Sequence, residues 1–279
     1  QVDFLWLAAS GGLYLLGTLP FALFWHRTLR TLGQRVRFGK TVRAYYIGHL
    51  GKYVPGKAMV VVLRAGLLRG PGVDASLAVA SIFYETLMMM STGALLAASI
   101  AAFWFRGQPL LFWTALGIMA VAGLPTLPPI FKRLVRLAGV GRMNPATVEK
   151  LDNLGYGTVI LGWALNAIGW AILGLSFWAV LRAMGLGENN PFGQFHLYTA
   201  AVSLATVAGF ISMMPGGAVV REAVLTELMA PYLGGGAALI GAILLRLVWL
   251  VAEMVISGIL YLGGRCWGGS CSADPNRNP

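Results

Sequence analysis

Six stretches of this chain are long and apolar enough to form membrane-crossing helices. An α-helix rises about 1.5 Å per residue, so about 20 apolar residues cover the hydrocarbon core of a bilayer. Only 11% of the residues are charged and 57% are hydrophobic, whereas a soluble domain carries about 25% charged residues. We therefore predict an all-α, polytopic integral membrane protein whose residues 1–279 form a single membrane domain. The predicted spans are residues 4–25, 75–105, 109–130, 157–184, 197–214 and 235–263.

The distribution of basic residues predicts which loops face the cytoplasm. The segment 26–43 contains six Lys and Arg residues and no acidic residue, and 131–155 contains five against two acidic residues. The segments 106–108 and 185–196 contain a single Arg between them. Because Lys and Arg accumulate in cytoplasmic loops, we expect loops 26–43 and 131–156 on the cytoplasmic side of the cell membrane. The net charge of +11 then reflects topology, and we expect no nucleic-acid partner.

Two apolar segments, residues 44–70 and 215–231, are broken by Pro-Gly motifs. Proline removes an amide donor and disfavours helix in the residue before it, and glycine permits a turn. If 44–70 crossed the membrane fully, the two basic loops would lie on opposite faces, so we expect this segment to enter and return as a re-entrant hairpin. We predict two such Pro-Gly-broken re-entrant segments besides the six spans. The motifs are Pro55-Gly56 and Pro215-Gly216-Gly217.

The two broken segments align with each other as parts of an internal repeat. When the prolines at 55 and 215 are superimposed, further features coincide, and each half then has a long span with a charge near its start. We predict pseudo-repeat halves at 1–130 and 157–263, separated by the basic loop 131–156 and followed by a disordered tail at 264–279. A repeat of this kind places the binding site between its halves, near mid-membrane. The coinciding pairs are Ala58 with Ala218, Val60 with Val220 and Leu68 with Leu228, and the charges Glu85 and Arg246 follow the respective prolines by 30 and 31 residues.

Ionisable residues within the apolar segments are the candidate binding residues. Such groups are costly in a membrane, and they normally face a cavity or a partner. The helix that starts after the second break aims amide hydrogens at that break, which suits a phosphate or a carboxylate. The candidate substrate-binding residues are Lys52, Pro55, Gly56, Lys57, Arg64, Glu85, Pro215, Gly216, Gly217, Arg221, Glu222 and Arg246.

An alternative for each of these charges is a buried ion pair that only holds helices together. Glu85 with Arg246 is one such pair, and Lys52 alternatively reaches the cytoplasmic interface. His49 and Glu253 also lie in the apolar segments, and Glu253 shares a helix face with Arg246 because the two are seven residues apart. Both interpretations, a ligand site and a structural network, remain open at this point.

The sequence contains no motif of a known catalytic site. It has no His-Glu-x-x-His zinc motif, no phosphate-binding Walker loop and no serine nucleophile elbow. Its two cysteines, Cys266 and Cys271, lie in the predicted tail, where they either close a small disulfide or stay unpaired. We therefore expect no catalytic residues, no metal and no cofactor. The stretch 131–151 is either a basic amphipathic segment on anionic lipid or an ordinary cytoplasmic loop.

The two broken motifs resemble those of the lysylphosphatidylglycerol synthase transmembrane (flippase-like) family, and the resemblance covers nearly the whole chain. Members are polytopic membrane proteins, some of them fused to an aminoacyltransferase that makes lysyl-phosphatidylglycerol or to glycosyltransferases that act on lipid-linked sugars. The resemblance implies translocation of a lipid between leaflets. No stretch outside the predicted spans and re-entrant segments exceeds about 25 residues, so we expect the stand-alone membrane domain without the aminoacyltransferase, and no enzyme. The matching motifs are Gly51-Lys52-Tyr53-Val54-Pro55-Gly56-Lys57 followed by Arg64, and Pro215-Gly216-Gly217 followed by Arg221-Glu222-Ala223.

These observations lead to one leading hypothesis and two alternatives. The leading hypothesis is a flippase that moves an anionic or aminoacylated phospholipid, or a lipid-linked intermediate, so its partners are membrane lipids with mainly anionic headgroups. The first alternative is a non-catalytic scaffold subunit that docks a separate lipid- or glycan-modifying enzyme through its basic loops. An intramembrane enzyme is the least favoured.

Overall fold

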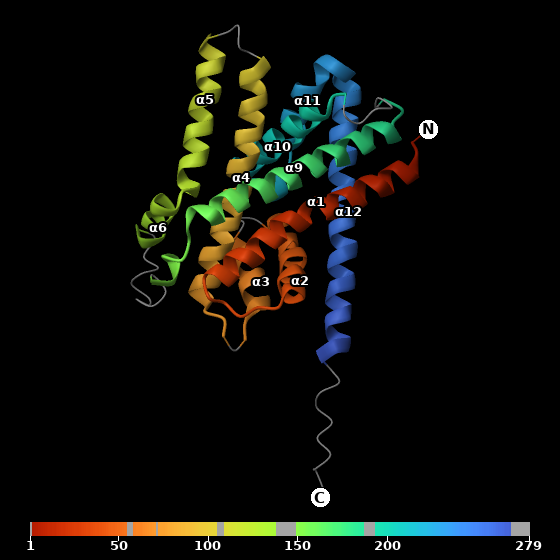
Figure 1. Cartoon of the computed structure of the whole chain (residues 1–279). Coiled ribbons are helices and arrows are strands. Elements are labelled where there is room, and N and C mark those ends of the chain that lie inside the picture. The colour runs from red at the N-terminus through yellow and green to blue at the C-terminus, as the bar shows by residue number, and fades with distance from the viewer. Residues whose placement is uncertain are drawn as a thin grey trace, which may run out of the picture.

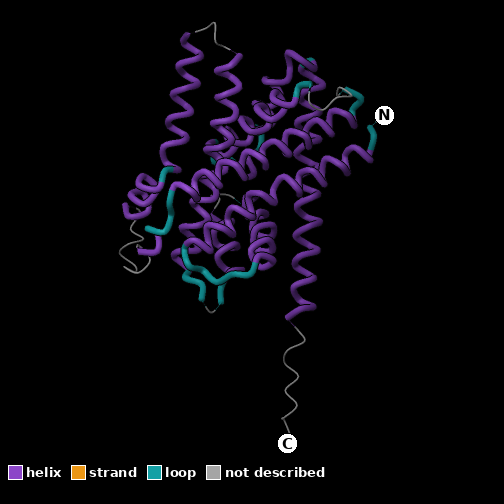
Figure 2. The backbone as a smooth tube through the Cα atoms, viewed as in Figure 1, coloured by secondary structure: helices purple, strands orange, loops and turns teal. Residues whose placement is uncertain are grey.

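Every regular element of the described chain is a helix. The computed structural model describes residues 2–54, 58–70, 72–104, 109–137, 149–186 and 193–268, and Figure 2 shows helices over most of this length. The first half contains α1 (Phe4–Thr31), α2 (Phe38–His49), the 3₁₀ turn η1 (Leu50–Tyr53), α3 (Ala58–Leu68) and α4 (Ala75–Trp104). The middle contains α5 (Pro109–Gly123), η2 (Leu124–Thr126) and α6 (Pro128–Leu137). The second half contains α9 (Tyr156–Ala183), α10 (Phe195–Ile211), η3 (Pro215–Gly217), α11 (Val220–Leu233) and α12 (Gly235–Gly268).

Four of these helices are long and apolar enough to cross a membrane. Within the described residues they are Phe4–Thr31, Ala75–Ile100, Tyr156–Ala183 and Gly235–Gly263. They correspond to four of the six predicted spans, and the all-α membrane fold is thereby confirmed. The exact count of six crossings stays a prediction.

The span predicted at 109–130 is wrong in its extent. α5 ends at Gly123, and the chain continues through a 3₁₀ turn into α6. The reason is the prolines at 125, 128 and 129, which cannot donate the amide hydrogen bonds of a continuing helix.

The span predicted at 197–214 and the tail predicted at 264–279 also differ from the structure. α10 covers only 17 residues, Phe195–Ile211, and it pairs with α11 across the Pro-Gly-Gly break. It is therefore the first arm of a helical hairpin. α12 continues to Gly268, so the chain is still helical beyond residue 264, and residues 269–279 lie outside the described part.

The two halves share one order of elements: a long helix, a hairpin broken by a 3₁₀ turn, and a second long helix (Figure 1). In the first hairpin Lys40 Nζ donates to the carbonyls of Leu68 and Arg69, at 3.1 and 2.9 Å. The start of α2 and the end of α3 therefore lie side by side, as expected for a segment that enters and returns.

The halves also exchange contacts. α4 packs against α10 of the other half, and α12 packs against α2. In Figure 1 the α2–α3 hairpin and the α10–α11 hairpin approach from opposite ends of the bundle, and the broken turns η1 and η3 contact each other between them. The interior between the halves is therefore built around the two breaks.

Small residues bring the central helices α1 and α9 close together. A Cβ atom at Gly169 would lie 2.8 Å from the carbonyl oxygen of Gly17 and against the ring of Phe21. Close backbone approach at small residues is the usual way that membrane helices associate, because lipid tails are as apolar as leucine. The fully buried Trp25, Trp170 and Phe177 fill the space on either side of this crossing.

The two basic loops lie at one end of the bundle. Leu32, Phe131 and Leu151 belong to one cluster of buried residues that packs against the lower part of α4. This shared end agrees with the prediction that 26–43 and 131–156 face the same compartment. Residues 138–148 of the second loop lie outside the described part.

Candidate functional site

A cavity of about 210 Å³ lies between the two hairpins. Its walls are formed by residues of α1, α2, α3, α4, α9, α10, α11 and α12 together with both 3₁₀ turns. One part of the wall is apolar and includes Phe21, Ile82, Met89 and Trp170. The other part is polar and is formed by His49, Lys52, Arg64, Glu85, Thr206 and Arg221.

The first break places the η1 residues beside α3. The chain folds back tightly here, because a Cβ atom at Gly51 would lie 2.6 Å from the backbone nitrogen of Val60. Val54 then adopts an extended conformation (φ −86°, ψ 135°), which is the conformation that a following proline favours. Pro55, Gly56 and Lys57, all predicted site residues, lie outside the described residues.

The second break depends on left-handed backbone conformations. Gly216 and Gly217 have φ of 60° and 68°, and Met213 and Val219 also have positive φ. A Cβ atom at Gly216 would lie 2.9 Å from the ring of Tyr53 in the first break. Glycine is needed here both for the backbone conformation and for the close contact between the two breaks.

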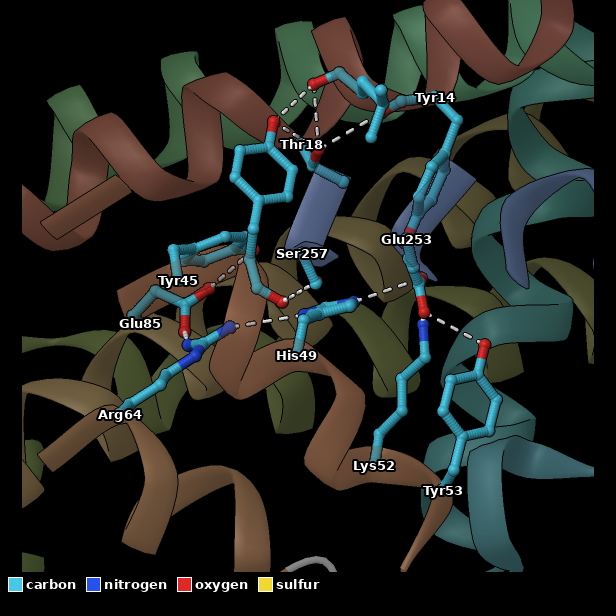
Figure 3. Close-up of polar contacts among 12 residues, drawn as sticks. Tyr14, Thr18, Tyr45, His49, Lys52, Tyr53, Arg64, Glu85, Glu253 and Ser257 are labelled. Carbon is cyan, nitrogen blue, oxygen red and sulfur yellow. Dashed lines mark hydrogen bonds and ion pairs between the residues drawn. The ribbon is translucent and has the colours of Figure 1, made fainter. Parts of the chain in front are cut away.

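Glu253 fastens the first break to α12. Its carboxylate, on a residue only 1% exposed, accepts hydrogen bonds from the hydroxyls of Tyr14 and Tyr53 and an ion-paired hydrogen bond from Lys52 Nζ (Figure 3). His49 Nε2 lies 3.8 Å from the same carboxylate. Residues of α1, α2 and η1 therefore converge on one acidic group of the second half.

Arg64 and Glu85 form a second buried pair, within the first half. Arg64 Nη1 donates to Glu85 Oε2 at 2.7 Å, and its guanidinium lies over the ring of Tyr45 at 4.1 Å. Arg64 Nη2 lies 3.3 Å from His49 Nδ1, and since arginine only donates, Nδ1 is the acceptor and Nε2 carries the hydrogen. His49 thus links this pair to Glu253, as Figure 3 shows.

Arg246 and Glu222 form the third pair, at 2.6 Å, within the second half. The pair Glu85 with Arg246, considered above as an alternative, is therefore wrong: each of the two charges is paired within its own half. The two halves nevertheless correspond. In each, a charge near the start of the second long helix pairs with the second arm of the hairpin, with the signs exchanged.

Arg221 lines the cavity and has no carboxylate partner among the described residues. Its guanidinium lies over the indole of Trp249, 4.2 Å from the ring centroid, and the same indole stacks on Tyr14 and donates to Ser176 Oγ at 2.9 Å. Its buried Nη2 atom has no hydrogen-bond partner. A guanidinium held by its face on an aromatic ring keeps its N–H edge available for an anion.

The charges around the cavity are unequal in number. The described cations are Lys52, Arg64, Arg221 and Arg246, and the described carboxylates are Glu85, Glu222 and Glu253. Each of these carboxylates is in one ion pair, so among the described residues Arg221 is the cation of this group that has no ion-pair partner, although Glu222 Oε2 is also left without a hydrogen bond. A buried unpaired charge is costly, and one phosphate or carboxylate ligand would balance it.

The predicted site residues thus separate into three groups. Lys52, Arg64, Glu85, Gly216, Gly217 and Arg221 all line the cavity. Pro215 lies within η3, and Glu222 and Arg246 form the pair just described. The third group, residues 55–57, is outside the described part.

Sequence reasoning missed four residues of the network as site members, namely Tyr14, His49, Tyr53 and Glu253. For Glu253 the seven-residue spacing from Arg246 was the available signal. Within the described residues no group of three or more His, Cys, Asp or Glu residues is suited to a metal ion. The side chains of Cys266 and Cys271 are outside the described part, so their pairing stays open.

Comparison with known proteins identifies one family. Residues 1–257 match the family model described as "Lysylphosphatidylglycerol synthase TM region". No curated protein matches the chain. The match includes both broken hairpins, the first three long helices and α12 as far as residue 257.

Proposed function

Because the chain belongs to the lysylphosphatidylglycerol synthase transmembrane family, a family of membrane domains linked to lipid modification or flipping, we propose that it is a lipid translocase. It holds the anionic headgroup of a phospholipid, an aminoacylated phospholipid or a lipid-linked intermediate in the cavity while the acyl chains stay in the bilayer. The observation that carries this proposal is Arg221 in the cavity wall, whose guanidinium has no carboxylate partner in the part of the chain that the structure describes.

The cavity supplies what a headgroup needs in order to pass through hydrocarbon. An uncompensated phosphate is strongly disfavoured there, whereas a guanidinium forms charge-assisted hydrogen bonds to it. Arg221 is the first contact, and the nearby cations Lys52, Arg64 and Arg246 provide further contacts as their own pairs rearrange. Glu85 and Glu222 hold those cations in place, or bind the ammonium of an aminoacylated lipid.

In this proposal the two breaks act as hinges of the hairpins. Pro55-Gly56 and Pro215-Gly216-Gly217 interrupt hairpins that meet from opposite ends, so each hairpin gives one leaflet a path to the same cavity. In this proposal both hairpins are re-entrant, and loops 26–43 and 131–156 face the cytoplasm. The protein lies in the cytoplasmic membrane, works without a cofactor or metal, and is not an enzyme.

Reconstitution into proteoliposomes tests this proposal. Anionic lipid with a labelled headgroup should leave one leaflet faster in the presence of the protein, and Arg221→Gln should slow this movement by about 10- to 100-fold, because a hydrogen bond to a charged group contributes about 1.5–3 kcal/mol. Arg182→Gln is the matched control, since Arg182 also lies over an indole, that of Trp6, but away from the cavity. An equal rate for Arg221→Gln and wild type would refute the site.

The scaffold alternative predicts a different result. A docking subunit does not move lipid, so the wild type would match protein-free vesicles. Replacing the basic residues between 131 and 142 with glutamine would then abolish the activity of the separate lipid-modifying enzyme, whereas Arg221→Gln would have no effect on it.

A further inference from the structure

The volume of the cavity limits what it can enclose. Its volume of about 210 Å³ lies below the roughly 300–1,000 Å³ of typical small-molecule pockets. A phosphate and a glycerol backbone fit such a space, but two long acyl chains do not. If a two-chain lipid binds with its phosphate at Arg221, its chains have to leave the cavity through the wall.

Some residues that line the cavity are also exposed on the molecular surface. Of the large apolar side chains that line the cavity, only Phe83 and Phe210 are exposed among the described residues, at 58% and 38%. Phe21, Ile82 and Trp170 are at most 1% exposed, and the remaining apolar lining residues are buried or partly buried. The two phenylalanines are therefore the large apolar lining residues that are also well exposed on the molecular surface.

The helices that carry these two residues come from different halves. Phe83 lies on α4 and Phe210 on α10, and the two helices pack against each other. On α4 the lining residues Thr86 and Met90 follow Phe83 at three and seven residues, which places all three on one helix face. Aromatic rings and a flexible methionine side chain suit the variable shape of an acyl chain.

We propose that Phe83 and Phe210 form a lateral portal between α4 and α10, through which the acyl chains of the bound lipid extend from the cavity into the bilayer. This inference rests on the proposed lipid translocation and adds the position of the chains. The portal selects for the number and bulk of acyl chains, whereas Arg221 selects for the charge of the headgroup.

The test compares two lipids with one headgroup. The probes are phosphatidylglycerol, which has two acyl chains, and its one-chain lyso form, each moved by the protein in vesicles of neutral phospholipid. The double variant Phe83→Trp with Phe210→Trp narrows the portal. Ile211→Trp is the matched control, because Ile211 is 72% exposed next to Phe210 but does not line the cavity.

We expect the narrowed portal to lower the ratio of two-chain to one-chain rates by about tenfold, while Ile211→Trp keeps the wild-type ratio. An unchanged ratio in the double variant overturns the portal, whether both rates stay the same or fall together. Failure of the translocation proposal itself is distinguishable, because then the wild type moves neither lipid faster than protein-free vesicles.

Discussion

The ion pair between Lys52 and Glu253 provides a quantitative test of how the two halves are joined. Glu253 is 1% exposed and accepts hydrogen bonds from Lys52, Tyr14 and Tyr53. The substitution Glu253→Gln removes its charge at nearly constant side-chain volume. The lysine, whose side chain is 23% exposed, is then left facing the cavity without its carboxylate. We expect this single substitution to destabilise the protein.

The magnitude follows from burial. Removing one partner of a fully buried pair costs about 3–5 kcal/mol, and the partial exposure of Lys52 places this case near the lower limit, at about 3 kcal/mol. Lys52→Met leaves the glutamate with its two tyrosine donors and costs a similar amount. The double variant removes both charges, so we expect a coupling free energy of about 2 kcal/mol between the two sites.

The assay is reversible unfolding in mixed micelles with increasing dodecyl sulfate, for the wild type, both single variants and the double variant. A neutral hydrogen bond between membrane helices averages only about 0.6 kcal/mol. A coupling free energy at or below that value would refute the proposal that the Lys52–Glu253 ion pair stabilises the contact between the halves. The pair Lys132–Asp152 is the internal control, because it lies at 3.3 Å with the aspartate 57% exposed, and its coupling should stay below about 1 kcal/mol.

Three further substitutions test the packing, each by the same unfolding assay. Gly216→Ala should lower the free energy of unfolding by about 2 kcal/mol, because it adds a methyl group at positive φ against the ring of Tyr53 in the first break. Gly33→Ala, at a similar φ but in open space, should lower it by about 1 kcal/mol. Gly169→Ala should cost about 2–3 kcal/mol at the α1–α9 crossing, whereas Gly157→Ala in the same helix, where a Cβ meets nothing within 4 Å, should be neutral or stabilising. Arg64→Lys should lower the free energy of unfolding by about 2 kcal/mol, because an ammonium cannot contact Glu85, His49 and the ring of Tyr45 together. For each of the three test variants, a stability equal to that of the wild type would contradict the corresponding contact.

The parts of the fold that the sequence predicted are those set by local chemistry. Long apolar runs give helices in a membrane, and prolines with glycines give breaks, so the two interrupted hairpins and four long helices were predictable. The extent of α5 was wrong because a hydropathy window passes over Pro125, although that residue removes a helical hydrogen bond. The role of α10 was also beyond prediction, since its apolar composition is the same for a crossing helix and for the arm of a hairpin.

The site was predictable as a set of residues but not as a set of pairs. Spacing along one helix shows which residues share a face, as for Arg246 and Glu253, but it does not show which neighbouring helix packs on that face. The partners of Glu253 come from α1, α2 and η1, about 200 residues away or more. Once the pairs are known, the unpaired Arg221 becomes evident, and no pattern in the sequence distinguishes it from the other cations.

A ligand-bound structure in a lipid bilayer is the decisive test of a headgroup site at Arg221. In cryo-electron microscopy of the protein in nanodiscs of anionic phospholipid, we expect density for a phosphate within hydrogen-bond distance of the Arg221 guanidinium, between η1 and η3. An empty cavity, or an Arg221 side chain paired with a carboxylate of the protein itself, would contradict the proposal that this cavity receives an anionic headgroup.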